Sequence, residues 1–142
     1  MELKRSNIFI GGGILILLVG GILLYNYFSK ELAVEDVLNE NYFTKDTVMS
    51  VQKLKDGKII PIQISDDKQN ELVRVFKDLK LIKSDESYPI LEADYIIAPK
   101  SNYTQKMYVF LEENVIVFSD KTSVGYVIQN KEFTPTIKQL LD

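Results

Sequence analysis

The sequence predicts an α+β fold in which a single N-terminal transmembrane helix precedes a small antiparallel sheet packed with helices, in the order ββαβββ(β)α. Three observations predict it. The chain has no charged residue from Ser6 to Ser29. After about residue 47, apolar and polar residues alternate with the period of two that is typical of β-strands. Segments that begin near Ser65 and Thr134 instead carry helix-start signals followed by apolar residues three and four apart.

The uncharged segment predicts a transmembrane helix at residues 8–28. Its centre is nearly all aliphatic residues and glycine, and about 20 apolar residues suffice to span a ~30 Å hydrocarbon core. Tyr25, Tyr27 and Phe28 stand where aromatic side chains meet the membrane interface. A cleaved signal peptide is the alternative, but the apolar run is longer than a usual h-region and no small-x-small site follows it.

The charges that flank this segment predict its orientation. Lys4 and Arg5 precede it, whereas Lys30 alone follows closely. The positive-inside rule therefore predicts a single-pass protein of the cell membrane, with its N-terminus in the cytoplasm and its C-terminal domain extracytoplasmic. The expected segments are a cytoplasmic N-terminus (1–7), a helix in the lipid bilayer (8–28), a juxtamembrane linker with a short helix (29–46) and an extracytoplasmic α+β domain (47–142).

The expected domain begins with a β-hairpin. Residues alternate in Thr47–Leu54 and in Ile59–Ile64, and between them stand Asp56 and Gly57, a pair typical of a type I′ turn. Pro61 has no N–H to donate, so its strand is expected at an edge of the sheet.

Two helices and further strands follow the hairpin. Ser65, followed by two carboxylates, predicts the N-cap of a helix whose apolar stripe continues to about Leu81. Thr134 and Pro135 predict the start of a C-terminal helix. The other expected elements are strands at Asp94–Ala98, Lys106–Glu112, Val115–Ser119 and Ser123–Gln129, and a short helix at Leu32–Leu38.

One of these strands is apolar on both faces. Met107, Val109 and Leu111 are expected to face the core. Tyr108 and Phe110 then face the other side, which the C-terminal helix or a partner would have to cover.

The stretch Lys106–Phe118, with Gly125–Ile128, Lys83-Ser84, Tyr88-Pro89, the upstream hairpin and the capped helix, forms a recognisable pattern. It resembles a small extracytoplasmic domain of unknown function that occurs in membrane-anchored proteins of Gram-positive bacteria. The resemblance covers about Thr47–Ile128. It implies a location and a fold, but no activity and no catalytic residues.

The composition excludes much site chemistry. The chain contains no His and no Cys, which excludes a Ser-His-Asp triad, a thiol nucleophile and zinc-thiolate sites. Residues 31–142 carry 14 Lys and Arg against 19 Asp and Glu, a net charge of -5, which disfavours a nucleic-acid partner. We expect no cofactor, no metal ion and no catalytic residue.

Two sets of residues remain as candidate sites. Ser65 and Lys68 have the Ser-x-x-Lys spacing of some serine acyl enzymes, although the boxes that accompany it in those enzymes are absent. Tyr88, Tyr103 and Tyr126 flank expected loops or turns and form a possible interaction surface, since tyrosine is favoured at binding surfaces.

These observations favour a non-enzymatic, membrane-anchored binding domain whose partner is an envelope protein or a cell-wall component. One alternative is a small accessory subunit of a membrane complex, in which the apolar segment makes the contacts. The other is a hydrolase that uses Ser65 and Lys68.

Overall fold

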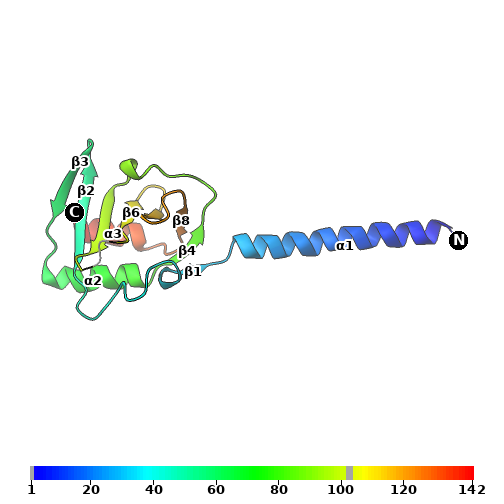
Figure 1. The fold of residues 1–142 in the computed structure, drawn as a ribbon, viewed down its shortest axis with the longest axis horizontal. Helices are drawn as coiled ribbons and strands as arrows, with labels where there is room; N and C mark the ends of the chain where they lie inside the picture. The colour runs from blue at the N-terminus through cyan, green and yellow to red at the C-terminus, as the bar shows by residue number, and fades with distance from the viewer. Residues whose placement is uncertain (1, 102–103) are drawn as a thin grey trace. The chain divides into compact units, whose positions relative to one another are not determined.

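The computed structural model describes residues 2–101 and 104–142. The chain divides into two compact units, Met1–Lys30 and Glu31–Asp142. Figure 1 shows the long helix of the first unit and the mixed α and β structure of the second. The α+β fold lies entirely in the second unit.

The first unit contains one helix, α1 (Glu2–Phe28). The expectation of a transmembrane helix at residues 8–28 is contradicted, and with it the single-pass cell-membrane location. No helix in the described part of the chain is long and apolar enough to cross a membrane.

The second unit is built on one antiparallel sheet of eight strands in the described part of the chain, in the order β1-β4-β8-β7-β6-β5-β2-β3. Each strand is antiparallel to its neighbours. The strands are β1 (Leu32–Ala33), β2 (Met49–Lys55), β3 (Lys58–Ile62), β4 (Lys80–Lys83), β5 (Tyr95–Pro99), β6 (Met107–Phe110), β7 (Val115–Phe118) and β8 (Gly125–Ile128).

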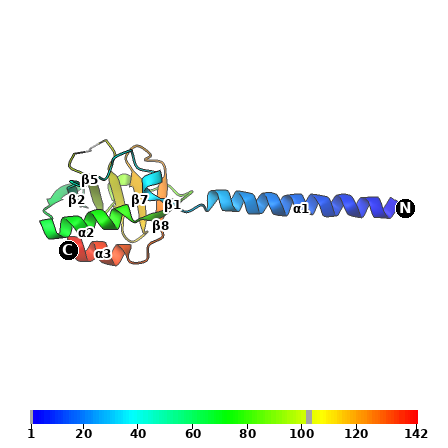
Figure 2. The same cartoon turned by 90° about the horizontal axis from the view of Figure 1, so that it is seen from below.

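Two α-helices cover the same face of this sheet, which we call the first face. They are α2 (Asp66–Lys77) and α3 (Phe133–Leu141), and Figure 2 shows them side by side. Two short 3-10 helices, η1 (Val34–Asp36) and η2 (Ile90–Glu92), lie in connecting segments. The opposite side of the sheet, the second face, has no α-helix over it in the described residues.

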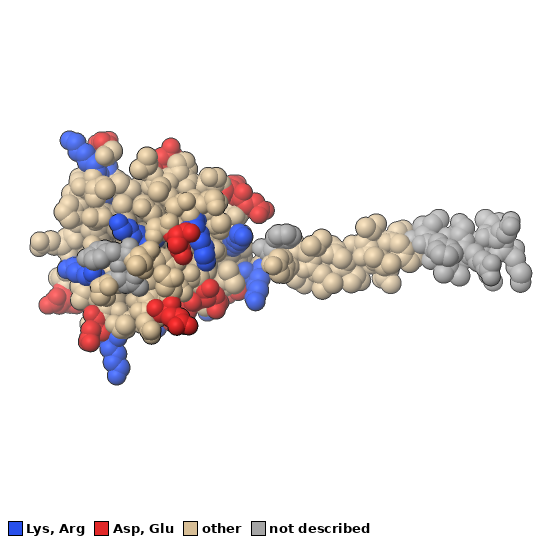
Figure 3. All heavy atoms as spheres, in the orientation of Figure 1, with Lys and Arg blue, Asp and Glu red and all other residues tan. Residues whose placement is uncertain are grey.

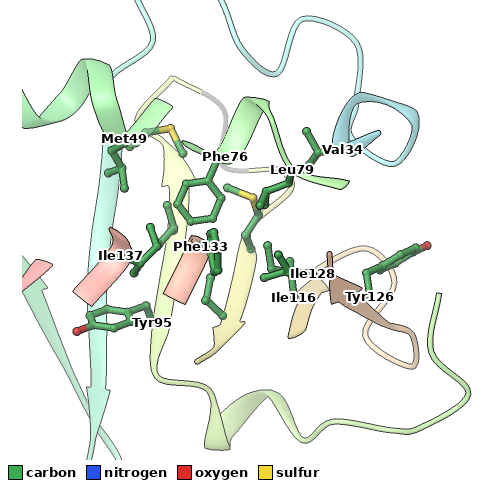
Figure 4. Packing of buried hydrophobic residues seen from close by; sticks show 14 of the residues in the cluster. Val34, Met49, Phe76, Leu79, Tyr95, Ile116, Tyr126, Ile128, Phe133 and Ile137 are labelled. Carbon is green, nitrogen blue, oxygen red and sulfur yellow. The ribbon is translucent and has the colours of Figure 1, made fainter. Parts of the chain in front are cut away.

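The main core lies between the first face and the two helices. Phe76 of α2 and Phe133 of α3 meet edge to face, with ring centroids 5.5 Å apart, and Figure 4 shows them at the centre of the cluster. From the strands, the core receives Met49, Val51, Leu81, Tyr95, Ile97, Met107, Val109, Ile116, Phe118, Tyr126 and Ile128.

The hairpin of β2 and β3 is confirmed. Asp56 and Gly57 both have positive φ, 52° and 71°, as a type I′ turn requires. β3 is an edge strand, so the expected place of Pro61 is also confirmed. Pro61 is opposite Gln52, three pairs beyond the hydrogen-bonded pair that closes a two-residue hairpin. Its missing N–H therefore faces away from β2, where it breaks the exposed edge without removing a ladder bond.

The helix after Ser65 ends earlier than its apolar stripe predicts. α2 stops at Lys77, and the next residues form strand β4. The side chain of Asn130 holds this boundary, because its Oδ1 accepts the N–H of Lys80 at 2.8 Å and its Nδ2 donates to the carbonyl of Asp78 at 3.2 Å. Two long-range hydrogen bonds thus fix the backbone just after the end of the helix.

The segment expected as a linker instead packs into the second unit. Val34 and Val37 are buried in the main core, and β1 and η1 replace the expected short helix. The buried side chain of Gln105 ties the segment down: its Oε1 accepts the N–H of Asn39 at 2.8 Å, and its Nε2 donates to the carbonyl of Val37 at 3.2 Å. The Tyr42 hydroxyl donates to the Gln105 carbonyl at 2.9 Å.

Candidate binding surface

The second face of the sheet carries a smaller apolar cluster. Its buried members are Ala93, Phe110, Val115 and Val117. Of the two covers expected for this face, the C-terminal helix is excluded, because α3 packs on the first face. The segment that contains η2 covers part of it instead, and the partly buried side chains around the cluster are Leu54, Tyr88, Ile90, Tyr108 and Val127.

Tyr88 anchors that covering segment. Its ring lies 5.6 Å from the ring of Phe110, centroid to centroid, and its hydroxyl donates to the carboxylate of Glu86 at 3.2 Å. The ring also rests on Gly125, where an added Cβ would overlap the ring atoms of Tyr88. Gly125 therefore permits the covering segment to lie close against β8.

The strands β2, β3 and β5 and the start of β6 form a less covered part, which we call the open end of the second face. Ile59 lies directly across from Leu54 in the hairpin and is 55% exposed. A shallow cavity of about 80 Å³ also opens here. The open end comprises Ser50, Gln52, Leu54, Ile59, Ile96, Ala98, Lys106 and Tyr108.

The structure places two of the three tyrosines that were expected to form one surface, and these two lie on opposite faces of the sheet. Tyr88 is half-buried on the second face. Tyr126 belongs to the main core on the first face and packs edge to face with Phe118, at 5.4 Å. Tyr103 lies outside the described residues. Successive residues of a strand point to opposite faces, so Tyr126 points to the first face and Val127 to the second. Periodicity in the sequence separates the two sets of residues but does not say which set meets the helices.

Ser65 and Lys68 lie at the start of α2, where the structure gives the two side chains different partners. Ser65 occupies the N-cap position of α2, but its side chain makes no capping hydrogen bond. A hydrogen bond from that side chain instead lowers the pKa of the Asp67 carboxyl, which is fully exposed. The Lys68 Nζ donates to the carbonyl of Leu140 at 3.2 Å, so the lysine joins α2 to the end of α3.

Burial raises the pKa of three tyrosines in the main core. The pKa of Tyr42 is strongly raised, first by burial and then by the negative charge of Asp120. The same two causes, in the same order, raise the pKa of Tyr126. Burial also raises the pKa of Tyr95. All three phenols therefore stay protonated at neutral pH, and each acts as a neutral core group.

A second hollow, of about 240 Å³, lies between α2 and α3. Its charged residues are Glu71, Arg74, Asp78 and Glu132, and an exposed ion pair joins Arg74 to Glu71 at 3.8 Å. In Figure 3, acidic and basic side chains are interspersed over the face in view. Within the described residues, no group of three or more His, Cys, Asp or Glu side chains is placed to hold a metal ion.

A scan against protein-family models finds no match to this chain, and comparisons with curated proteins and with solved structures find none either. The resemblance noted in the sequence therefore stays a prediction.

Three polar residues of the open end were missed by reasoning from sequence: Ser50, Gln52 and Lys106. Alternation in β2 places the first two on one face, which is a readable signal. Their proximity to Lys106 is not readable, because it depends on β5 pairing with both β2 and β6.

Proposed function

We propose that residues 31–142 form a non-enzymatic binding module that recognises another protein through the open end of the second face. The observation that carries the proposal is the unequal cover of a sheet that is apolar on both faces. Helices α2 and α3 cover the first face, whereas among the described residues the segment around Tyr88 covers part of the second.

The exposed side chains at the open end support this proposal. Ile59 presents more than half of its surface to solvent and lies directly across from Leu54, next to the pair of Gln52 and Pro61 on the same face. Apolar surface bordered by polar residues is typical of protein interaction sites. The engagement of Lys68 with the Leu140 carbonyl argues against the alternative of a hydrolase that uses Ser65.

Site-specific photo-crosslinking in intact cells tests the proposal. A photoreactive amino acid at Ile59 of the full-length chain is expected to capture one partner reproducibly. The matched control places the same amino acid at Gln139, which is exposed on α3. If Ile59 gives no crosslink above the Gln139 control, the second face is not the binding surface.

A further inference from the structure

The cavity at the open end has an apolar floor and a polar rim. Ser50 and Gln52 of β2, Ile96 and Ala98 of β5, and Lys106 just before β6 line it. Strand register brings them together, because Ser50 is opposite Ala98 and Gln52 is opposite Ile96. Ile96 is 8% and Ala98 is 4% exposed, so the floor lies below the rim.

The three polar side chains of the rim have no partner among the residues that the structure describes. Neither the Ser50 hydroxyl, the Gln52 amide nor the Lys106 ammonium takes part in a side-chain hydrogen bond or ion pair with any residue that the structure describes. None of these polar atoms is buried without a partner either, so all remain accessible to a ligand. Together they offer hydrogen-bond donors from lysine, serine and glutamine.

The charge at this place is also uncompensated. In β2, β3, β5 and β6, the residues that alternate onto the second face include no carboxylate. Asp94, which precedes β5, already accepts the N–H of Leu111 at 2.8 Å. The Lys106 charge therefore lies on a sheet face whose neighbouring strand positions are apolar or neutral.

We propose that this cavity receives a carboxylate, an Asp or Glu side chain of the protein that binds the open end. Its volume of about 80 Å³ accommodates a carboxylate, which is only a few times larger than the ~30 Å³ share of one water. Lys106 supplies the charge, Ser50 and Gln52 supply additional donors, and Leu54 and Ile59 contact apolar residues next to the acid. The inference rests on the proposed function and names the chemistry of its partner.

The test is an NMR titration of the full-length chain with a matched pair of capped peptides. The probes are acetyl-Leu-Glu-Leu-amide and acetyl-Leu-Gln-Leu-amide, which differ in the carboxylate alone. The glutamate peptide is expected to shift the amide signals of Ser50, Gln52 and Ala98 and to bind about fivefold more tightly than the glutamine peptide, the effect expected of one partly exposed ion pair.

Two variants complete the design. Lys106→Met keeps the length of the side chain and is expected to abolish the difference between the peptides. Lys100→Met, at an exposed lysine just after β5, is expected to keep it. Equal binding of both peptides, or no shift at Ser50 and Gln52, overturns the carboxylate site. Neither result affects the crosslinking from Ile59, so the failure of this inference and that of the proposed function are distinguishable.

Discussion

The two faces of the sheet are built from the same strands, yet they end in different surroundings. On the first face, α2 and α3 cover a continuous cluster that runs from Met49 to Ile128 across the strands. On the second face, Tyr88 and its neighbours cover four buried residues, and the open end keeps exposed apolar and polar side chains. An apolar strand pattern therefore does not by itself show how fully a sheet face is covered. The segments that pack on each face determine how much of it stays exposed.

The largest expected effect compares one phenylalanine from each face. Phe76→Ala removes the ring at the centre of the first-face core and is expected to lower the free energy of unfolding by about 3–5 kcal/mol. Phe110→Ala on the second face is expected to lower it less, because the half-buried ring of Tyr88 can move into the space. Urea unfolding followed by circular dichroism measures both, and equal losses would contradict the comparison.

The second prediction concerns the close approach of Tyr88 to Gly125. Gly125→Ala places a methyl group against the ring and is expected to lower the free energy of unfolding by about 1–3 kcal/mol. In the background of Tyr88→Ala the same substitution is expected to have a smaller effect, since the overlap is gone. A double-mutant cycle by urea unfolding measures this coupling. Purely additive effects would show that the ring does not rest on Gly125.

The third prediction uses the raised pKa of Tyr42. Since the folded state keeps this phenol protonated while the unfolded chain ionises near pH 10.0, its contribution is fully present below that pH and is lost as the pH rises above it. Tyr42→Phe is expected to flatten this alkaline loss in part, because Tyr95 and Tyr126 also have raised pKa values. At neutral pH the variant is expected to lose about 1 kcal/mol, from the hydrogen bond to the Gln105 carbonyl.

Unfolding free energies measured at several pH values between about 8 and 11 decide this prediction. A variant whose alkaline loss matches that of the wild type would exclude Tyr42 as a source of it.

The smallest effect is expected at Ser65. From its position before α2, Ser65 is expected to be an N-cap, and Ser65→Ala would then lower the free energy of unfolding by about 1 kcal/mol. The side chain makes no capping hydrogen bond, so we expect a change within about 0.5 kcal/mol. Ser65→Gly is the matched variant that also changes the backbone. If thermal unfolding shows that Ser65→Ala lowers the free energy of unfolding by about 1 kcal/mol or more, Ser65 does act as an N-cap.

Local signals predicted much of the sheet and both helices of the second unit. Asp56 and Gly57 predicted the first hairpin because only a positive φ fits that turn. Asn114, with φ 58°, lies in the turn between β6 and β7 that Glu113-Asn114 predicted. β1 was missed because a strand of two residues carries no alternation to identify. β4 (Lys80–Lys83) was missed because Leu81 continues the apolar stripe of the preceding helix.

The candidate site divides in the same way. Tyr88 was singled out from its place in a loop. It lies in the segment that covers the second face, outside the open end, and its role in an interaction surface stays a prediction. Ser50, Gln52 and Lys106 were not singled out, because nothing in the sequence near each of them indicates a site. They lie close together because β5 pairs with β2 on one side and with β6 on the other.

The sequence by itself determined which residues alternate, where tight turns fall and which chemistry is excluded by the lack of His and Cys. These properties depend on side-chain type and on neighbours a few residues away. The tertiary structure alone decided that α2 and α3 share one face and that the segment after residue 30 packs into the core. Such outcomes depend on contacts between residues far apart in the chain, which local pattern does not encode.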